Sequence, residues 1–259
     1  MRAMVSMYWM PELARANDAW WDGLKKHWRG AGLRDVPDKS QEPDGLYPLW
    51  LAPDLFFAQT CGYPLTHELK DKVTLVATPC YSAPGCVGPN YCSRIIVRED
   101  SGIGDLAQLA GKVAAINSHD SQSGWNVLRH SLMTALKGKG AFPRIIETGG
   151  HRKSVAAVRE GRADVASIDC VTYARLGAVA PQEVAGLRVI ADTASAPSLP
   201  YITRKDIPAD DLRRLRDGLR AAVEDAGLAE ARKALLISDI VVLPLSAYDR
   251  ILEIEEAAA

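Results

Sequence analysis

A serine-rich stretch carries the polar groups of this chain that are best suited to binding a small anion. Residues 117–126 read NSHDSQSGWN and follow the apolar, β-branched run 113–116. A segment with helical apolar spacing comes next, so the stretch is predicted to be a strand-to-helix turn that exposes unpaired backbone N–H groups. Hydroxyls, an amide and a glycine that permits close approach are added by Ser121, Gln122, Ser123 and Gly124.

This combination suits a phosphoryl, phosphonyl or carboxylate group, because a helix N-terminus attracts negative charge and serine and amide groups donate to its oxygens. The alternative interpretation is a serine that caps the helix, followed by an ordinary loop.

Two further strand-to-helix turns contribute residues that could bind a ligand. In the turn 148–154 (TGGHRKS), His151, Arg152 and Lys153 come at a helix start, where cations oppose the helix dipole and a bound anion would remove the conflict. Solvated cations and a polar cap are the alternative there. Asp169 ends the apolar strand predicted over 164–168 and could accept from a ligand amine, or could cap the helix that follows.

Tyrosines could close over a ligand from another part of the chain. Tyr8 ends the first predicted strand, 3–8, and Tyr81 and Tyr91 lie in the Gly/Pro/Cys-rich segment 78–91. Ordinary packing at a loop is the alternative for all three.

The sequence predicts binding rather than catalysis. It contains no nucleophile elbow, Walker loop, GxGxxG, HExxH or EF-hand motif, and we expect no catalytic residue, metal or cofactor. Five cysteines form no CxxC pair, so a zinc site is not expected. Two interpretations of the cysteines are open. Cys61, Cys80, Cys86 and Cys92 could include a disulfide pair, or the cysteines could be buried free thiols.

Composition favours a small-molecule partner. Net charge is −1, with 31 Lys and Arg against 32 Asp and Glu, so no overall field recruits nucleic acid or an anionic membrane. No apolar run is long enough for a transmembrane segment, and the N-terminus has no signal-peptide core. The expected location is periplasmic if a signal segment was removed and cytoplasmic if the sequence is complete.

Strands alternating with helices predict an α/β fold with mostly parallel sheets. Turn-rich breaks near residues 78–91 and 195–200 indicate one domain inserted into another, with a ligand cleft between the lobes. We expect lobe 1 to comprise 1–92 and 203–259, and lobe 2 to comprise 93–202. Residues 39–47 are expected to be a loop, and a last helix is expected over 246–256, capped by Ser246.

The order of motifs resembles the phosphate, phosphite and phosphonate substrate-binding proteins of ABC transporters, a branch of the type II periplasmic-binding-protein fold. The motifs that carry the resemblance are AQTCGYP (58–64), TPCYSAPGC (78–86), YCSRIIVR (91–98), GKVAAINSHDSQSGWN (111–126), TGGHRKS (148–154), GRADVASIDCVT (161–172) and APSLPYIT (196–203).

The resemblance implies two α/β lobes that close about a hinge around a small anionic or zwitterionic ligand, for delivery to an ABC permease. It implies that Ser121, Gln122 and Ser123 hold the oxyanion and that His151 assists. It further implies that Asp169 accepts from a ligand amine and that Tyr81, with Tyr8, closes from lobe 1. Gln122 stands where the family commonly has a small hydroxyl residue.

Two alternatives stay open at this point. One is a cytoplasmic enzyme on the same fold, similar to menaquinone-pathway or thiamin-pyrimidine-forming proteins, with His151, Asp169 and Cys86 as candidates for acid–base or nucleophilic work. The other is a ligand sensor that signals through a protein partner.

Overall fold

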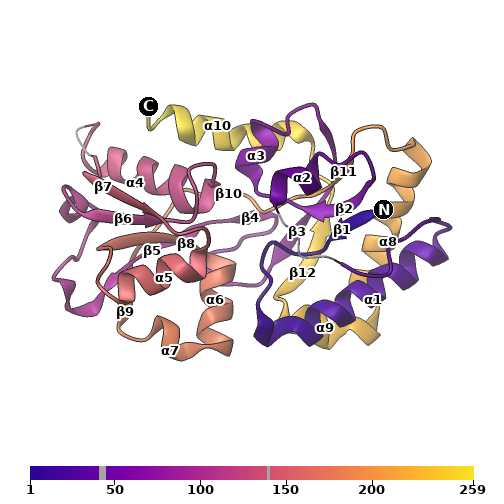
Figure 1. The fold of residues 1–259 in the computed structure, drawn as a ribbon, viewed down its shortest axis with the longest axis horizontal. Helices are drawn as coiled ribbons and strands as arrows, with labels where there is room; N and C mark the ends of the chain where they lie inside the picture. Colours follow the sequence, from indigo (N-terminus) through magenta and orange to yellow (C-terminus); the bar gives the residue numbers. More distant parts are fainter. Residues whose placement is uncertain (41–44, 139–140) are drawn as a thin grey trace. The chain divides into compact units, whose positions relative to one another are not determined.

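The computed structural model describes residues 1–40, 45–138 and 141–259, which divide into two compact units (Figure 1). Unit 1 comprises Met1–Ser82 and Pro197–Ala247, and unit 2 comprises Ala83–Ala196 and Tyr248–Ala259. Each unit is an α/β layer structure built on a five-stranded sheet. The helices of the described ranges include none that is long and apolar enough to cross a membrane.

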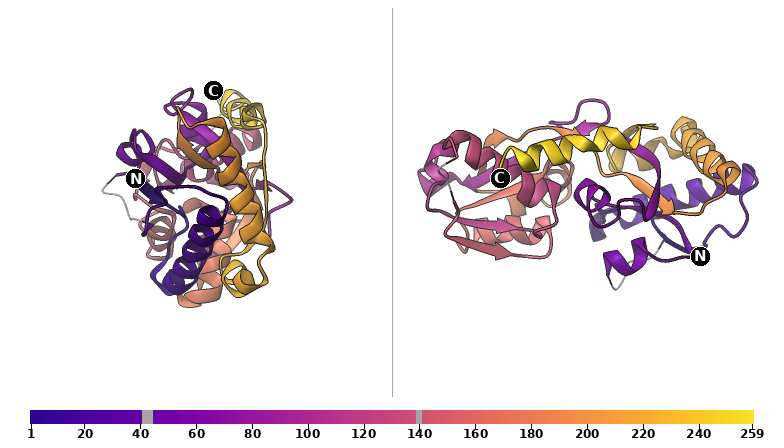
Figure 2. Two further views of the ribbon diagram at one scale, coloured as in Figure 1. Left: turned by 90° about the vertical axis from the view of Figure 1, so that its right-hand side faces the viewer. Right: turned by 90° about the horizontal axis from the view of Figure 1, so that it is seen from above.

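These boundaries differ from the predicted ones, most clearly at the C-terminus. The helix α10 (Asp249–Glu256) groups with unit 2, whereas we expected all of 203–259 in lobe 1. It buries Ile251 and Ile254 and packs against α4 (Val127–Ala135). Figure 2 shows this last helix of the chain in yellow. An apolar face of this kind stabilises only where it leaves water, and α4 provides the surface that covers it.

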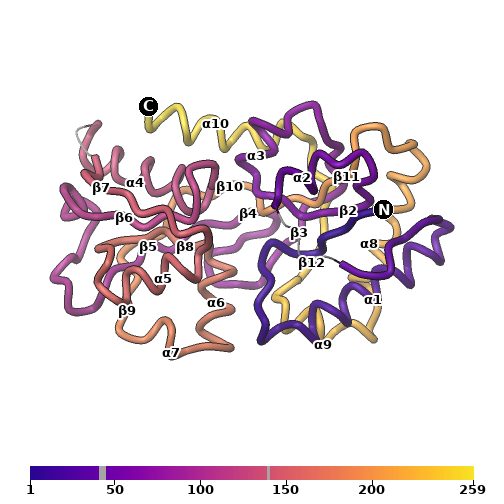
Figure 3. Tube along the Cα trace, viewed as in Figure 1, coloured from indigo at the N-terminus to yellow at the C-terminus, as the bar shows by residue number. Residues whose placement is uncertain are grey.

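The sheet of unit 1 holds one late strand, β11, between the early strands β2 and β3, and a second late strand, β12, at its edge (Figure 3). Strand β1 is parallel to β2, whereas β11 is antiparallel to both β2 and β3, and β12 is antiparallel to β3. The sheet order is β1 (Arg2–Met4), β2 (Leu55–Gln59), β11 (Tyr201–Arg204), β3 (Val73–Tyr81) and β12 (Ile237–Val241).

Helix packing in unit 1 centres on Trp28. The spacing of Trp20, Leu24 and Trp28 puts one apolar stripe on α1 (Ala14–Gly30), and all three side chains are buried. Trp28 lies against Gly218 of α8 (Ala209–Glu224), where any added Cβ would collide with the indole, and its Nε1 donates to Leu215 O at 3.0 Å. The remaining helices of unit 1 are α2 (Leu46–Trp50), α3 (Gly62–Thr66) and α9 (Ala229–Ala234), with 3₁₀ turns at Pro11–Leu13 and Ala226–Leu228.

The sheet of unit 2 is mixed, so the prediction of mostly parallel sheets was wrong. Strand β6 is parallel to β7 and β8, but β5 is antiparallel to both β8 and β9. Hydrophobic periodicity reports which face of a strand is buried and not its direction, which depends on long-range pairing. The order is β7 (Arg144–Glu147), β6 (Val113–Ile116), β8 (Val165–Asp169), β5 (Ser93–Arg98) and β9 (Leu187–Asp192).

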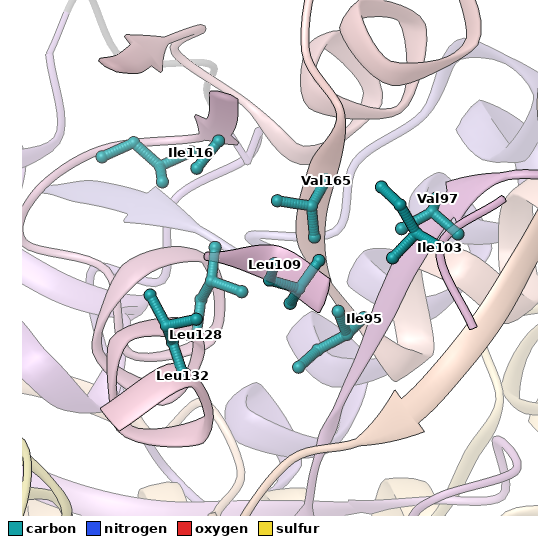
Figure 4. Packing of buried hydrophobic residues seen from close by; sticks show 9 residues of the cluster. Ile95, Val97, Ile103, Leu109, Ile116, Leu128, Leu132 and Val165 are labelled. Carbon is teal, nitrogen blue, oxygen red and sulfur yellow. The ribbon is translucent and has the colours of Figure 1, made fainter. Parts of the chain in front are cut away.

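The hydrophobic core between α4 and the sheet shows which face of β8 points toward α4. Leu128 and Leu132 of α4 pack against Ile95 and Val165 of the sheet (Figure 4). Since side chains alternate along a strand, Ser167 shares the face of Val165 and points toward the α4 side. The other helices of unit 2 are α5 (His151–Arg159), α6 (Cys170–Val179) and α7 (Pro181–Val184), with 3₁₀ turns at Glu99–Ser101 and Leu106–Leu109.

Several predicted element ends shift in the structure. Strand β1 stops at Met4, so Tyr8 lies in a turn beyond it and not at a strand end. Ser246 does not cap the last helix, because Leu245–Tyr248 is a 3₁₀ turn and Tyr248 precedes α10. Of the loop predicted over 39–47, residues 41–44 lie outside the described ones and Leu46 begins α2. A short pair, β4 (Asn90–Tyr91) and β10 (Ala196–Pro197), completes the strands of the described ranges.

Candidate functional site

The serine-rich turn after β6 ends in a π-helical turn, Gln122–Asn126. Ser121 precedes it with an extended backbone, and its Oγ accepts from the backbone N–H of Gly124 at 3.0 Å. The carbonyl of Ser121 accepts from Asn126 N at 3.0 Å, which is the wide spacing of a π turn. Ser121 is therefore a neutral cap, as the plainer interpretation of this serine expected, at the start of the helix that continues as α4.

Gly124 is required by packing within this turn. A Cβ at this position would collide with the Oδ1 of Asn117, and the backbone N of Asn117 is also close. The glycine thus lets the turn fold back onto the end of β6 and keeps its backbone near the strand end.

Ser123 is held from two sides. Its Oγ lies 2.8 Å from His151 Nε2, and its backbone carbonyl accepts from Ser167 Oγ at 2.7 Å. Burial lowers the pKa of His151 to about 4, although the backbone of Ser167 opposes this shift. His151 is therefore a neutral hydrogen-bonding partner of Ser123 near pH 7, and the contact joins the turns after β6 and β7.

Gln122 is buried and faces inward. Its Oε1 accepts from Asn126 Nδ2 at 2.7 Å. Gln122 and Ser123 also line a crevice that is too narrow to hold a water molecule, and its other walls are Tyr91, Cys92, Ser93, Val127, Thr193, Ala194 and Ala196.

Asp169 completes the N-terminus of its own helix. Its Oδ1 accepts from the backbone N–H groups of Val171 at 2.8 Å and Thr172 at 3.2 Å, and its side chain is buried. The capping interpretation of this residue is therefore present in the structure. That it also accepts from a ligand amine stays a prediction.

The cations of the TGGHRKS turn do not gather at the serine-rich turn. The Nε of Arg152 donates to Glu183 Oε2 at 2.8 Å, so its charge is balanced within the protein. Lys153 is exposed. Of the three candidate cations at this helix start, the one that reaches Ser123 is His151, and it is uncharged near pH 7.

In unit 1, the two candidate tyrosines form a buried pair. The rings of Tyr8 and Tyr81 meet edge to face with centroids 5.3 Å apart. Gln59, at the end of β2, donates to the hydroxyl of Tyr81 at 2.9 Å and to Leu199 O at 3.0 Å, and accepts from Met7 N at 2.9 Å. That these tyrosines contact a ligand stays a prediction.

All five cysteines are free thiols. The Sγ atoms of Cys86 and Cys170 lie 3.4 Å apart, a contact that joins one member of the predicted group to a cysteine outside it. Hydrogen bonding to Cys170 and burial raise the pKa of Cys92 above its usual range. Within the part of the chain that the structure describes, no group of three or more His, Cys, Asp or Glu side chains is placed to hold a metal ion.

Sequence reasoning missed the residues that hold the candidates in place. Ser167, Asn126 and Gln59 are buried polar side chains with partners far along the chain. The available signal was a polar residue in an otherwise apolar strand, as with Ser167 in VASID and Gln59 in LFFAQ. Nothing comparable marks Asn126, which lies in a helix start.

A family match says more about this chain than its fold does. Residues 53–244 match the family described as ABC transporter, phosphonate, periplasmic substrate-binding protein. The match covers well over half of the chain, so this protein belongs to that family, which confirms the resemblance predicted from the motifs. The family is one of substrate-binding proteins and not of enzymes.

Solved structures share the fold over nearly the whole chain. A binding protein component of an ABC phosphonate transporter from Pseudomonas aeruginosa is 17% identical, covers 100% of this chain and 86% of its own, and has a TM-score of 0.79. PhnD1 from Prochlorococcus marinus, in complex with methylphosphonate, is 12% identical, covers 99% of this chain and 97% of its own, and has a TM-score of 0.78.

A Xanthomonas citri protein bound to ATP is 18% identical, covers 100% of this chain and 97% of its own, and has a TM-score of 0.70. At these identities the likeness shows the fold alone, which is the two-lobe type II periplasmic-binding-protein fold. No curated protein matches the sequence.

Proposed function

We propose that this protein binds a small oxyanion of the phosphonate or phosphate-ester class at residues 121–124 and delivers it to an ABC permease. The observation that carries the proposal is the contact of Ser123 Oγ with neutral His151 Nε2 at a helix start capped by the neutral hydroxyl of Ser121. Such an end offers backbone N–H groups and hydroxyl donors to a ligand, and its partial positive charge favours an anion.

The ligand class is supported by the family and by what two neighbours of the same fold hold. PhnD1 was solved with methylphosphonate and the Xanthomonas citri protein with ATP, and both ligands present phosphorus-bound oxygens. The membership of an ABC-transporter family supports a permease as partner.

The proposal is tested by isothermal titration of the purified protein with methylphosphonate, 2-aminoethylphosphonate, inorganic phosphate, sulfate and ATP. We expect at least one phosphorus oxyanion to bind. We expect Ser123→Ala to weaken that binding roughly 10-fold or more, because a hydrogen bond to a charged group contributes about 1.5–3 kcal/mol.

Ser131→Ala is the matched control. Ser131 is a buried serine of α4 whose Oγ donates to Val127 O at 2.8 Å, away from the turn. This variant should keep the affinity of the unmodified protein. If no compound of the panel binds, or if Ser123→Ala binds as well as Ser131→Ala, the proposed site is wrong.

A further inference from the structure

Three of the five thiols meet in one place within unit 2, and the proposed function gives none of them a role. The Sγ atoms of Cys86 and Cys170 lie 3.4 Å apart, and the thiol of Cys92 is hydrogen-bonded to that of Cys170. Cys61 and Cys80 belong to unit 1. We call Cys86, Cys92 and Cys170 the thiol cluster, and Cys170 is its centre because it contacts both of the others.

The strand pairing places Cys92 directly opposite Cys170. Ser93 of β5 pairs with Asp169 of the antiparallel strand β8. The next pair along the ladder is Cys92 and Cys170, and the backbone N of Cys170 donates to the carbonyl of Cys92 at 3.1 Å. Residues opposite each other in this way point to the same face with Cα atoms roughly 4.5–5.5 Å apart, which lies within the range of a disulfide. The sheet therefore holds these two thiols at a spacing that a disulfide can bridge.

Gly85 brings the third thiol to this pair. Its φ of +100° lies in the left-handed region, which glycine adopts without strain. A Cβ at this position would lie 2.8 Å from the Sγ of Cys92 and 3.3 Å from the Cβ of Cys170, which is closer than ordinary contacts. The backbone before Cys86 can therefore lie directly against the pair, and the sulfur of Cys86 reaches Cys170.

The three thiols differ in their access to solvent. Cys92 and Cys170 are buried, with 7% and 1% of their surface exposed, whereas Cys86 is partly exposed. Hydrogen bonding to Cys86 and burial raise the pKa of Cys170, although its contact with Cys92 opposes the shift. The hydrogen bond to Cys170 and burial raise the pKa of Cys92 as well. Because the thiolate is the reactive form, these two thiols are protected, and an oxidant from solvent reaches Cys86 first.

We propose that the thiol cluster is a site of oxidation by hydroperoxides, in which Cys86 reacts with the oxidant and Cys170 resolves the product as a disulfide. The Cys86 thiolate attacks an oxygen of hydrogen peroxide, the O–O bond breaks, and the leaving hydroxide becomes water with the proton that Cys86 lost. The sulfur of Cys170 then attacks the Cys86 sulfenic acid. The S–O bond breaks, and the hydroxyl group leaves with the Cys170 proton as a second water. The peroxide is reduced by two electrons, which the two sulfur atoms supply.

Cys92 is a second partner for Cys170. By thiol–disulfide exchange its sulfur attacks the Cys170 sulfur, the bond to Cys86 breaks, and Cys86 takes up the proton that Cys92 loses. The strand pairing favours this exchange, since it already sets the spacing of Cys92 and Cys170. Oxidation therefore yields one disulfide that always contains Cys170, and either linkage ties the start of α6 to the segment 86–92.

The test oxidises the purified, reduced protein with hydrogen peroxide at about pH 8 and maps the products by mass spectrometry of peptides. Free thiols should fall from five to three, because one disulfide uses two of them. The oxidised protein should melt at least about 4 °C higher, since a link between positions 84 residues apart restricts the unfolded chain. Cys80→Ser, at a buried cysteine of β3, is the matched control and should react like the unmodified protein.

Three variants assign the steps. Cys86→Ser should slow disulfide formation at least about 10-fold, because the two remaining thiols of the cluster are buried. Cys170→Ser should form no disulfide, and its Cys86 sulfenic acid should accumulate and be trapped by dimedone. Cys92→Ser should still form the disulfide between Cys86 and Cys170.

The thiol cluster does not depend on oxyanion binding, so this inference and the proposed function fail separately. A disulfide without Cys170, no disulfide at all, or a Cys86→Ser variant that oxidises as fast as the unmodified protein would overturn the assignment. If Cys170→Ser folds poorly, the thiol count and the peptide maps of the unmodified protein and of Cys86→Ser still decide between these outcomes.

Discussion

Strands β6 and β8 lie side by side and parallel in the sheet of unit 2, and each leads into a helix start that is completed differently. After β8, the Asp169 carboxylate accepts from the N–H groups of Val171 and Thr172, so the chain supplies its own anion. After β6, the cap is the neutral hydroxyl of Ser121, beside a buried amide donor on Gln122.

The difference shows that a helix N-terminus can be satisfied within the protein after one strand and remain available to an external anion after the next. A carboxylate cap satisfies both the free N–H groups and the partial charge of the helix end. A serine cap satisfies one N–H group and leaves the electrostatic preference for an anion in place. We infer that an external oxyanion takes the position after β6 that Asp169 occupies after β8.

The largest effect is expected from a variant that gives the helix start after β6 the same carboxylate cap as the helix start after β8. Ser121→Asp would place a carboxylate at the β6 turn, where it would repel a bound oxyanion and compete for the same donors. We expect methylphosphonate affinity to fall at least about 100-fold, or roughly 3 kcal/mol, while the melting temperature stays the same or rises. Titration calorimetry and a melting curve measure the affinity and the melting temperature. An unchanged affinity would contradict the inference that an external oxyanion binds at the helix start after β6.

The next effect concerns pH and the neutral partner of the β6 turn. The pKa of His151 is about 4 in the folded protein, against about 6.5 in an unfolded chain. As pH falls below about 6.5, His151 binds a proton in the unfolded chain but not in the folded protein, which favours unfolding. The contribution of neutral His151 to the free energy of unfolding is therefore complete above about pH 6.5 and is lost toward about pH 4. The total loss is about 3 kcal/mol.

Urea unfolding between about pH 7 and about pH 4 measures this loss, and His151→Gln should remove it. His67→Gln, at an exposed histidine of unit 1, is the control and should retain the acid sensitivity. Saturating methylphosphonate should reduce the loss in the unmodified protein, since an anion at Ser123 favours protonated His151. Acid sensitivity that survives His151→Gln in full would contradict the assignment.

The smallest effect is expected from a variant that changes only the helix start after β8. Asp169→Asn keeps a capping oxygen but removes the charge, so we expect a loss of about 1 kcal/mol, or a melting temperature about 2–4 °C lower. Phosphate should then stabilise this variant more than it stabilises Asp217→Asn, a control at an exposed aspartate of α8. Equal responses of the two variants to phosphate would show that the Asp169 charge does not occupy the helix end.

Local signals predicted much of the architecture and part of the site. The apolar runs and turn residues placed β6, β7, β8 and the helices after them within a few residues of their observed bounds. They also singled out Ser121, Ser123 and His151, because a hydroxyl or imidazole at the start of a helix is visible in the sequence order alone. The family resemblance rested on the same turns.

Strand direction and domain membership could not be predicted in this way. Strand β5 runs antiparallel to β8, and α10 belongs to unit 2, because both depend on partners about 75 to 125 residues away in the chain. A burial pattern records that a face leaves water, but it does not identify the surface that covers it.

The sequence by itself therefore determined that three strand ends carry polar turns, that one of them is rich in neutral donors, and that the chain resembles an oxyanion-binding family. The tertiary structure decided what each polar group does. It placed Asp169 on its own helix, Arg152 on Glu183, and His151 on Ser123. Only the packing of α10 on α4 brings the Ile251 carbonyl to Asn126, and that long-range acceptor is what orients the amide of Gln122.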